Sequence, residues 1–140
     1  MVEPEGYQHL RRFRLEGTTP VWTFALGDAL LEKRVWMQQR ANTAYLRYDL
    51  LQGSQPLTLD IKMIVNYRNH HGNSHAGDWR MDVHRVNSGI RLVAYDGAVP
   101  LYLLSAGTEV VPRHEWYRAY ALALEAYRGR DMLDDHLYAD

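Results

Sequence analysis

The chain has 140 residues, which suits one domain with a single core. Its formal net charge of -1 argues against nucleic-acid binding, which needs a concentrated basic surface, and gives no reason to expect a polybasic membrane contact. Cysteine is absent, so disulfides and thiolate metal sites are excluded.

Apolar residues recur at every second position through the first half of the chain. This pattern is typical of antiparallel strands with one buried face and one wetter face. We predict strands over residues 21–26, 30–37, 43–51 and 57–65, separated by Gly27-Asp28, by residues 40–42 and by residues 53–56. The last strand alternates most strictly, and its apolar stripe is predicted to be core: Leu57, Leu59, Ile61, Met63 and Val65.

A polar loop, NYRNHHGNSHAGDW over residues 66–79, interrupts the pattern before it resumes. Further strands are predicted over residues 80–86, 90–95 and 98–104. Asp96-Gly97 between two alternating runs predicts a type I′ hairpin turn, in which both residues have positive φ. Pro100 is expected at an edge or a bulge, because it cannot donate a ladder hydrogen bond.

The C-terminal part changes period. Between residues 114 and 128, tyrosines and small apolar residues recur at helical spacing, and Pro112 and Gly129 are suitable helix limits. The stretch WYRAYALALEAY also alternates as a strand would. Seven predicted strands with short turns and no βαβ rhythm indicate an all-β, antiparallel β-sandwich of one domain over residues 1–140, with a short C-terminal helix.

The histidines of the polar loop raise the question of a metal site. His70, His71 and His75 could approach one zinc ion, but glycine, asparagine and serine residues between them leave the geometry unfixed. We therefore expect no metal and no cofactor. A polar connection, or the binding of a polar ligand by Arg68, Asn69, His70 or His71, remains open.

Enzyme signatures are missing from the sequence. It contains no recognisable pair of catalytic carboxylates, no G-x-S-x-G elbow and no glycine-rich phosphate loop. Tyrosine (10) and tryptophan (4) outnumber phenylalanine (2), and such amphipathic rings suit surfaces that bind sugars or partners, although tyrosine also favours strands. We predict no catalytic residues, and a binding or structural domain.

Several segments together resemble one family. They are LEGTT (15–19), GDALLEKRVWM (27–37), ANTAYLRYDLL (41–51), VNYRNHH (65–71), WYRAYALALEAYRG (116–129) and DHLY (135–138). Their order is similar to that of the N-terminal domain of bacterial and archaeal glycogen-debranching enzymes of the amylo-α-1,6-glucosidase type. Members of this family often carry an acid and an aromatic residue where Asn69 and His70 stand here, so the role of this loop does not transfer directly.

The resemblance implies a large β-sandwich of the supersandwich type that precedes an (α/α)6 catalytic domain. It implies a non-catalytic domain of a cytoplasmic glycoside hydrolase, with α-glucan and the catalytic domain as partners and with neither nucleic acid nor a membrane. The expected sugar contacts lie in the polar loop: Arg68, Asn69, His70, His71 and Trp79. Alternatives are a purely structural sandwich that packs on a catalytic domain, and an independent enzyme that uses the histidines.

Overall fold

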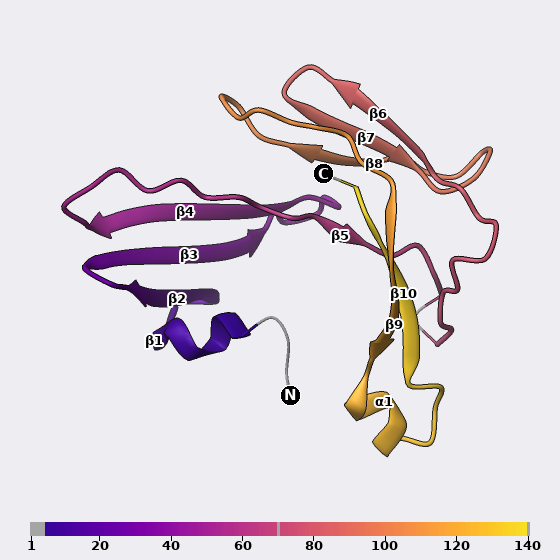
Figure 1. Ribbon diagram of the computed structural model, residues 1–140, viewed down its shortest axis with the longest axis horizontal. Helices are drawn as coiled ribbons and strands as arrows, with labels where there is room; N and C mark the ends of the chain where they lie inside the picture. Colours follow the sequence, from indigo (N-terminus) through magenta and orange to yellow (C-terminus); the bar gives the residue numbers. More distant parts are fainter. Residues whose placement is uncertain (1–4, 70, 140) are drawn as a thin grey trace. The chain divides into compact units, whose positions relative to one another are not determined.

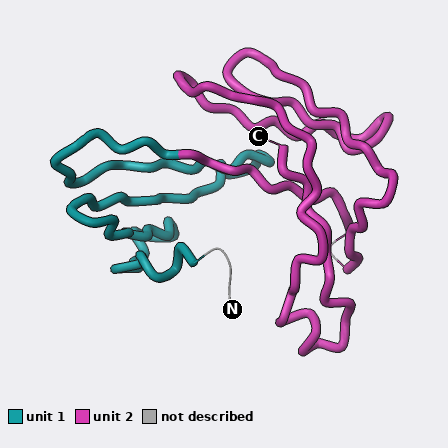
Figure 2. Tube along the Cα trace, in the orientation of Figure 1, with its two compact units in different colours: residues 1–59 teal, residues 60–140 magenta. Residues whose placement is uncertain are grey.

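The computed structural model describes residues 5–69 and 71–139 and consists of antiparallel strands with one short α-helix (Figure 1). This confirms the predicted all-β class and the short C-terminal helix. The chain divides into two compact units, residues 1–59 and residues 60–140 (Figure 2). The expectation of one sandwich domain over the whole chain stays a prediction, and each unit is described below by itself.

The first unit is a four-stranded meander. A 3₁₀ helix (Glu5–His9) leads into β1 (Leu10–Glu16), β2 (Thr19–Leu26), β3 (Ala29–Met37) and β4 (Ala44–Gln52), which pair in the order β1-β2-β3-β4. Gly17 and Gly27 have φ values of 61° and 63°, so the first two turns use a conformation that glycine adopts without strain. The strands predicted from residue 21 to residue 51 are confirmed, whereas β1 was not predicted.

The pleat of this sheet places most charged side chains on one side, although Lys33 lies on the other side and buried Val21 lies opposite Arg34. Residues directly opposite each other in adjacent strands share a face, and successive residues alternate. One side, called the polar face, comprises Arg12, Arg14, Glu16, Thr19, Thr23, Glu32, Arg34, Trp36, Tyr45, Arg47 and Asp49. The other side, called the apolar face, includes Phe13, Leu15, Trp22, Leu31, Val35, Met37, Leu46 and Leu50.

The second unit contains two three-stranded sheets. One has the order β5 (Ile64–Val65), β10 (Leu133–Tyr138), β9 (Glu115–Ala121), and the other the order β6 (Asp82–Val86), β7 (Gly89–Val93), β8 (Leu101–Leu104). Both sheets contribute to one core of Val65, Met81, Leu92, Ala94, Leu137 and Ala139, against which Trp79 and Trp116 pack. This shared core joins the two sheets of the unit.

The predicted strand over residues 57–65 is wrong for most of its length. Only Ile64–Val65 forms a strand, through pairing with Tyr138 and Leu137. Leu57, Leu59 and Ile61 are exposed, Met63 is half-buried, and Val65 alone of the predicted stripe is buried. No strand in the described part of the chain pairs with residues 57–63, and an alternating sequence without a ladder partner is not stabilised as a strand.

The C-terminal helix is shorter than helical spacing suggested. Residues 115–121 form β9, which pairs with β10 from Glu115↔Tyr138 to Ala121↔Leu133, and α1 covers only Ala123–Tyr127. Pro112 therefore does not begin a helix, whereas Gly129, with φ of 70°, follows the helix end as expected. Within residues 5–69 and 71–139, no helix is long and apolar enough to cross a membrane.

The connections of the β6-β7-β8 sheet match the predicted positions with one difference in geometry. Asn87-Ser88 turns between β6 and β7, with Ser88 at φ 65°. At the next connection Gly97 has φ of 79°, but Asp96 is not among the positive-φ residues, so the turn is not type I′. Pro100 precedes the edge strand β8, in agreement with its missing N–H.

Gly89 supplies a stability test of this sheet. A Cβ atom at this position would lie 2.0 Å from the carbonyl oxygen of Leu103, a backbone atom that cannot move without disturbing the β7–β8 pairing. We expect Gly89→Ala to lower the free energy of unfolding by at least about 2 kcal/mol, as overpacking does. Urea unfolding measures this change. Gly72→Ala is the control, because its nearest contact would be an ordinary 3.8 Å; equal losses in the two variants would contradict the close approach.

Candidate functional site

The polar loop is bound to β10 through a buried carboxylate. Asp134 is fully buried, and its Oδ1 accepts a 2.6 Å hydrogen bond from the backbone N–H of Ser74. Its Oδ2 accepts a 3.0 Å hydrogen bond from the side chain of Asn66 and lies 3.0 Å from Nε of Arg68. The hydrogen-bonding capacity of the loop is therefore largely used inside the unit.

A second carboxylate fastens the same loop to β9. Asp135 Oδ2 accepts a 2.8 Å hydrogen bond from the N–H of Ala76, and Oδ1 accepts a 2.7 Å bond from the N–H of Ala119, which has φ of 57°. These two N–H donors hold the pKa of Asp135 below its ordinary value. The loop, β9 and β10 thus converge on two successive acids.

The structure gives the predicted loop residues different surroundings. Arg68 pairs with Asp134 and also donates to the carbonyl of Gly72. The indole N–H of Trp79 donates a 2.7 Å bond to the carbonyl of Ala94, and its ring packs on the core. Arg68 and Trp79 therefore have structural contacts, and a sugar-binding role for either stays a prediction.

Asn69 and His71, two further residues of the predicted set, lie at the surface. Asn69 Oδ1 accepts a 3.0 Å bond from the N–H of His71, and Nδ1 of His71 lies 2.8 Å from a guanidinium nitrogen of Arg130. His70 lies outside the described residues. Among those that are described, no three histidines or acids are grouped so that they could hold a metal ion.

A row of ion pairs crosses the polar face of the first unit. Glu32 is buried, and its two carboxylate oxygens lie 2.7 Å from Arg14 and 2.5 Å from Arg34. Glu16 pairs with the same two arginines. Burial raises the pKa of Glu32, but the hydrogen bonds from Arg14 and Arg34 outweigh it and leave the pKa lowered. Glu16 and Glu32 are thus committed to arginines and are poor candidates for a general acid.

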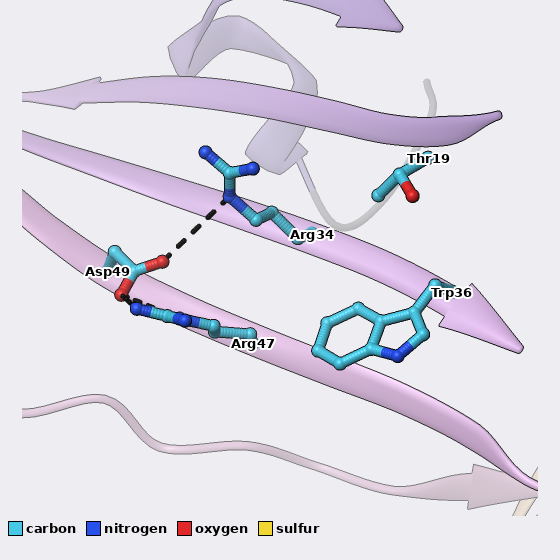
Figure 3. A pocket seen from close by; sticks show the side chains of 5 residues that line it. All are labelled: Thr19, Arg34, Trp36, Arg47 and Asp49. Atoms are coloured by element: carbon cyan, nitrogen blue, oxygen red, sulfur yellow. Dashed lines mark hydrogen bonds and ion pairs between the residues drawn. The ribbon is translucent and has the colours of Figure 1, made fainter. Parts of the chain in front are cut away.

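A hollow of about 430 Å³ lies at the end of this row and is lined by Thr19, Arg34, Trp36, Arg47 and Asp49. Figure 3 shows Asp49 between Arg34 and Arg47, with Trp36 further along β3. Asp49 lies 2.7 Å from Arg47 and 4.0 Å from Arg34. Guanidinium donors, a carboxylate acceptor and an aromatic ring therefore line one open hollow.

The β3–β4 register explains how this hollow forms. Trp36 is opposite Tyr45 and Arg34 is opposite Arg47, so their side chains stand on the same face. The rings of Trp36 and Tyr45 stack with centroids 5.3 Å apart and planes inclined by 15°. Trp36 keeps 38% of its surface exposed, so the pair forms an aromatic platform that solvent reaches.

Sequence reasoning missed this hollow although a signal for it was present. Trp36 follows Glu32 and Arg34 on one side of the strand at residues 30–37, and Tyr45, Arg47 and Asp49 share one side of the next strand. A hairpin with the observed register brings the two rows together.

By its fold, the chain is an all-β protein built of antiparallel sheets. A family model described as glycogen debranching enzyme N terminal matches residues 1–140, and the chain belongs to this family. The match confirms the resemblance drawn from the sequence. No curated protein and no solved structure matches the chain.

The Arg68–Asp134 pair gives a direct test of the role of the loop. Substituting an exposed arginine that lacks specific partners would change stability by no more than about 1 kcal/mol. Because Asp134 is fully buried, we expect Arg68→Ala to lose about 2–4 kcal/mol, slightly below the range for wholly buried pairs since Arg68 is partly exposed. Chemical denaturation of the whole chain measures this loss.

His71→Ala is the comparison for this variant. The contact of its side chain with Arg130 is exposed, and its backbone N–H, which bonds to Asn69, is kept in alanine. The loss should therefore stay within about 1 kcal/mol. If Arg68→Ala were as mild as His71→Ala, the pairing with Asp134 would not be stabilising.

Asp135 makes stability depend on pH. Because its pKa is lower in the folded state, the stabilisation is fully present above the pKa of the unfolded chain, about 4, and is lost as pH falls through the folded value. We expect Asp135→Asn to be less stable than the wild type at pH 7 and to lose less stability between pH 5 and pH 2. Urea midpoints across this range test the prediction; parallel curves for the two proteins would refute it.

Proposed function

We propose that this domain helps a glycogen-debranching enzyme to bind α-glucan and supports a separate catalytic domain that hydrolyses α-1,6 branch linkages. The observation that carries the proposal is the Trp36–Tyr45 platform beside Arg34, Arg47 and Asp49. Membership of the family supplies the substrate class, and the platform supplies the chemistry of contact.

The platform suits a sugar because glucose presents an apolar C–H face and a rim of hydroxyls. A partly exposed indole packs against the first, while guanidinium and carboxylate groups bond to the second. The side chain of Arg47 is 64% exposed and that of Asp49 is 27% exposed, so both are accessible to a ligand. A volume of about 430 Å³ falls within the ordinary range of small-ligand sites.

The polar loop keeps a smaller part in this proposal. Arg68 and Trp79 have structural contacts, so the loop residues best suited to touch glucan are Asn69 and His71, with Arg130 beside them. His70 stays in the predicted set without a structural description. The loop would make its own, smaller set of sugar contacts within the second unit.

The support of a catalytic domain rests on a different observation. The apolar face of the first unit exposes 53% of Phe13, 63% of Leu15 and 67% of Met37. Large apolar side chains gathered on one sheet face are typical of an interaction surface. The second candidate function is a structural domain without sugar binding of its own. The apolar face is the observation that supports it.

Trp36→Ala separates these two functions. We expect the 140-residue chain to bind maltoheptaose weakly, near the millimolar range. Loss of the indole should weaken binding at least about tenfold, while Trp36→Phe should retain part of it because a ring remains. Titration monitored by NMR shifts gives the dissociation constants.

Tyr102→Ala is the matched control, because it removes an exposed ring from β8, far along the chain from the platform. The control should bind as the wild type does. Wild-type binding by folded Trp36→Ala, or no binding by any of the proteins, would contradict the role of the platform and favour the structural function.

A further inference from the structure

A second hollow on the polar face is formed by a β-bulge in β1. Leu10 is opposite Phe24 and Arg12 is opposite Thr23, so two positions along β1 match one along β2, and Arg11 is the extra residue. Without the bulge, alternation would send Arg11 to the apolar face. With it, Arg11, Arg12 and Arg14 all line one hollow of about 610 Å³.

The charges of this hollow do not balance. Arg14 is engaged by Glu16 and Glu32. Within the described part of the chain, the side chains of Arg11 and Arg12 have neither an ion pair nor a hydrogen bond, and both residues are exposed. The one carboxylate lining the hollow, Glu32, is shared between Arg14 and Arg34. An excess of positive charge on a concave surface attracts an anion.

The other residues that line the hollow limit the kind of anion. Thr23 offers a hydroxyl, and Leu30 and Leu51 add apolar surface. The N–H groups of a guanidinium form a planar fork, which matches the oxygen atoms of a carboxylate or a phosphate. The leucines suit a ligand with an apolar side, such as the C–H face of a sugar ring. A sugar that carries a phosphate monoester meets all three requirements.

We propose that this hollow binds a phosphorylated sugar through Arg11 and Arg12. It shares no lining residue with the Trp36 hollow. The site is therefore distinct from the proposed neutral-glucan platform. The phosphate could come from a free sugar phosphate or from a phosphate ester on the glucan itself, and both present the same group to the arginines.

The test measures the binding of glucose 6-phosphate and of unmodified glucose to the 140-residue chain, by NMR titration at low salt. We expect glucose 6-phosphate to bind and glucose not to shift these residues. The double variant Arg11→Gln with Arg12→Gln should weaken the binding at least about tenfold. The control pair, Arg40→Gln with Arg85→Gln, removes the same net charge from exposed positions outside the hollow and should bind as the wild type does.

A second arm identifies the source of the phosphate. Phosphorylated amylopectin and the same polymer after enzymatic dephosphorylation are compared for binding to the wild type and to the double variant. Stronger binding of the phosphorylated polymer, lost in the double variant, assigns the site to esters on glucan, whereas equal binding of the two polymers assigns it to the free sugar phosphate.

Two results would overturn the proposal. One is that glucose 6-phosphate does not bind, which would leave Arg11 and Arg12 as charges that protect the edge strand β1 from pairing with other chains. The other is equal weakening in the arginine variant and its control, which would indicate a general charge effect. Maltoheptaose binding by the double variant is measured in parallel and should be unchanged, so this outcome is distinguished from failure of the Trp36 platform.

Discussion

Two successive carboxylates, Asp134 and Asp135, are buried in β10, and the second unit depends on hydrogen-bond donors to both. The two acids have different donors. The polar loop supplies Ser74, Asn66 and Arg68 to the first acid, and it shares the second with β9. A buried charge without such donors would be far too costly to retain.

This requirement gives the histidine-rich loop its form. The loop is long and polar because it must place main-chain N–H groups and polar side chains around β10, and its turns bring Ser74 and Ala76 into position. β10 is the middle strand of its sheet, between β5 and β9. The loop therefore holds in place the strand that pairs with both other strands of the sheet. The polar composition of the loop reflects these hydrogen bonds more than ligand chemistry.

Sequence patterns predicted the strands whose alternation is regular and whose partner is next in the chain, such as β2, β3 and β4. They missed β1 and β10 for one physical reason: Arg11-Arg12 and Asp134-Asp135 each place two charged residues where alternation requires one. The alternation at residues 57–63 also predicted a strand that does not form. Alternation shows which side chains a strand could bury, but it does not show whether a second strand is present to pair with it. The Trp36–Tyr45 platform could not be predicted, because it depends on the register between β3 and β4, and the sequence of one strand does not determine that register.

The ion pairs on the polar face also affect ligand binding. The exposed pairs, such as Arg47 with Asp49, add little to stability, whereas buried Glu32 depends on Arg14 and Arg34. They do hold Arg34 and Asp49 in place before any ligand arrives, so less side-chain freedom is lost on binding. They also neutralise the middle of the face, which confines the excess charge to the end where β1 begins.

The contrast between the two units in connectivity has a consequence for how the chain folds. In the first unit every strand pairs with its immediate neighbour, so all its contacts are local and can form as soon as about the first 52 residues are available. In the second unit Val65 pairs with Leu137, which closes a long loop of chain. During synthesis the meander can therefore assemble early, while β5 and the polar loop wait for β10 to emerge. Until then Val65, Met81 and Leu92 lack their core partners Leu137 and Ala139. Asn66, Arg68 and Ser74 likewise lack Asp134, so β10 completes the apolar core and the polar network of this unit together.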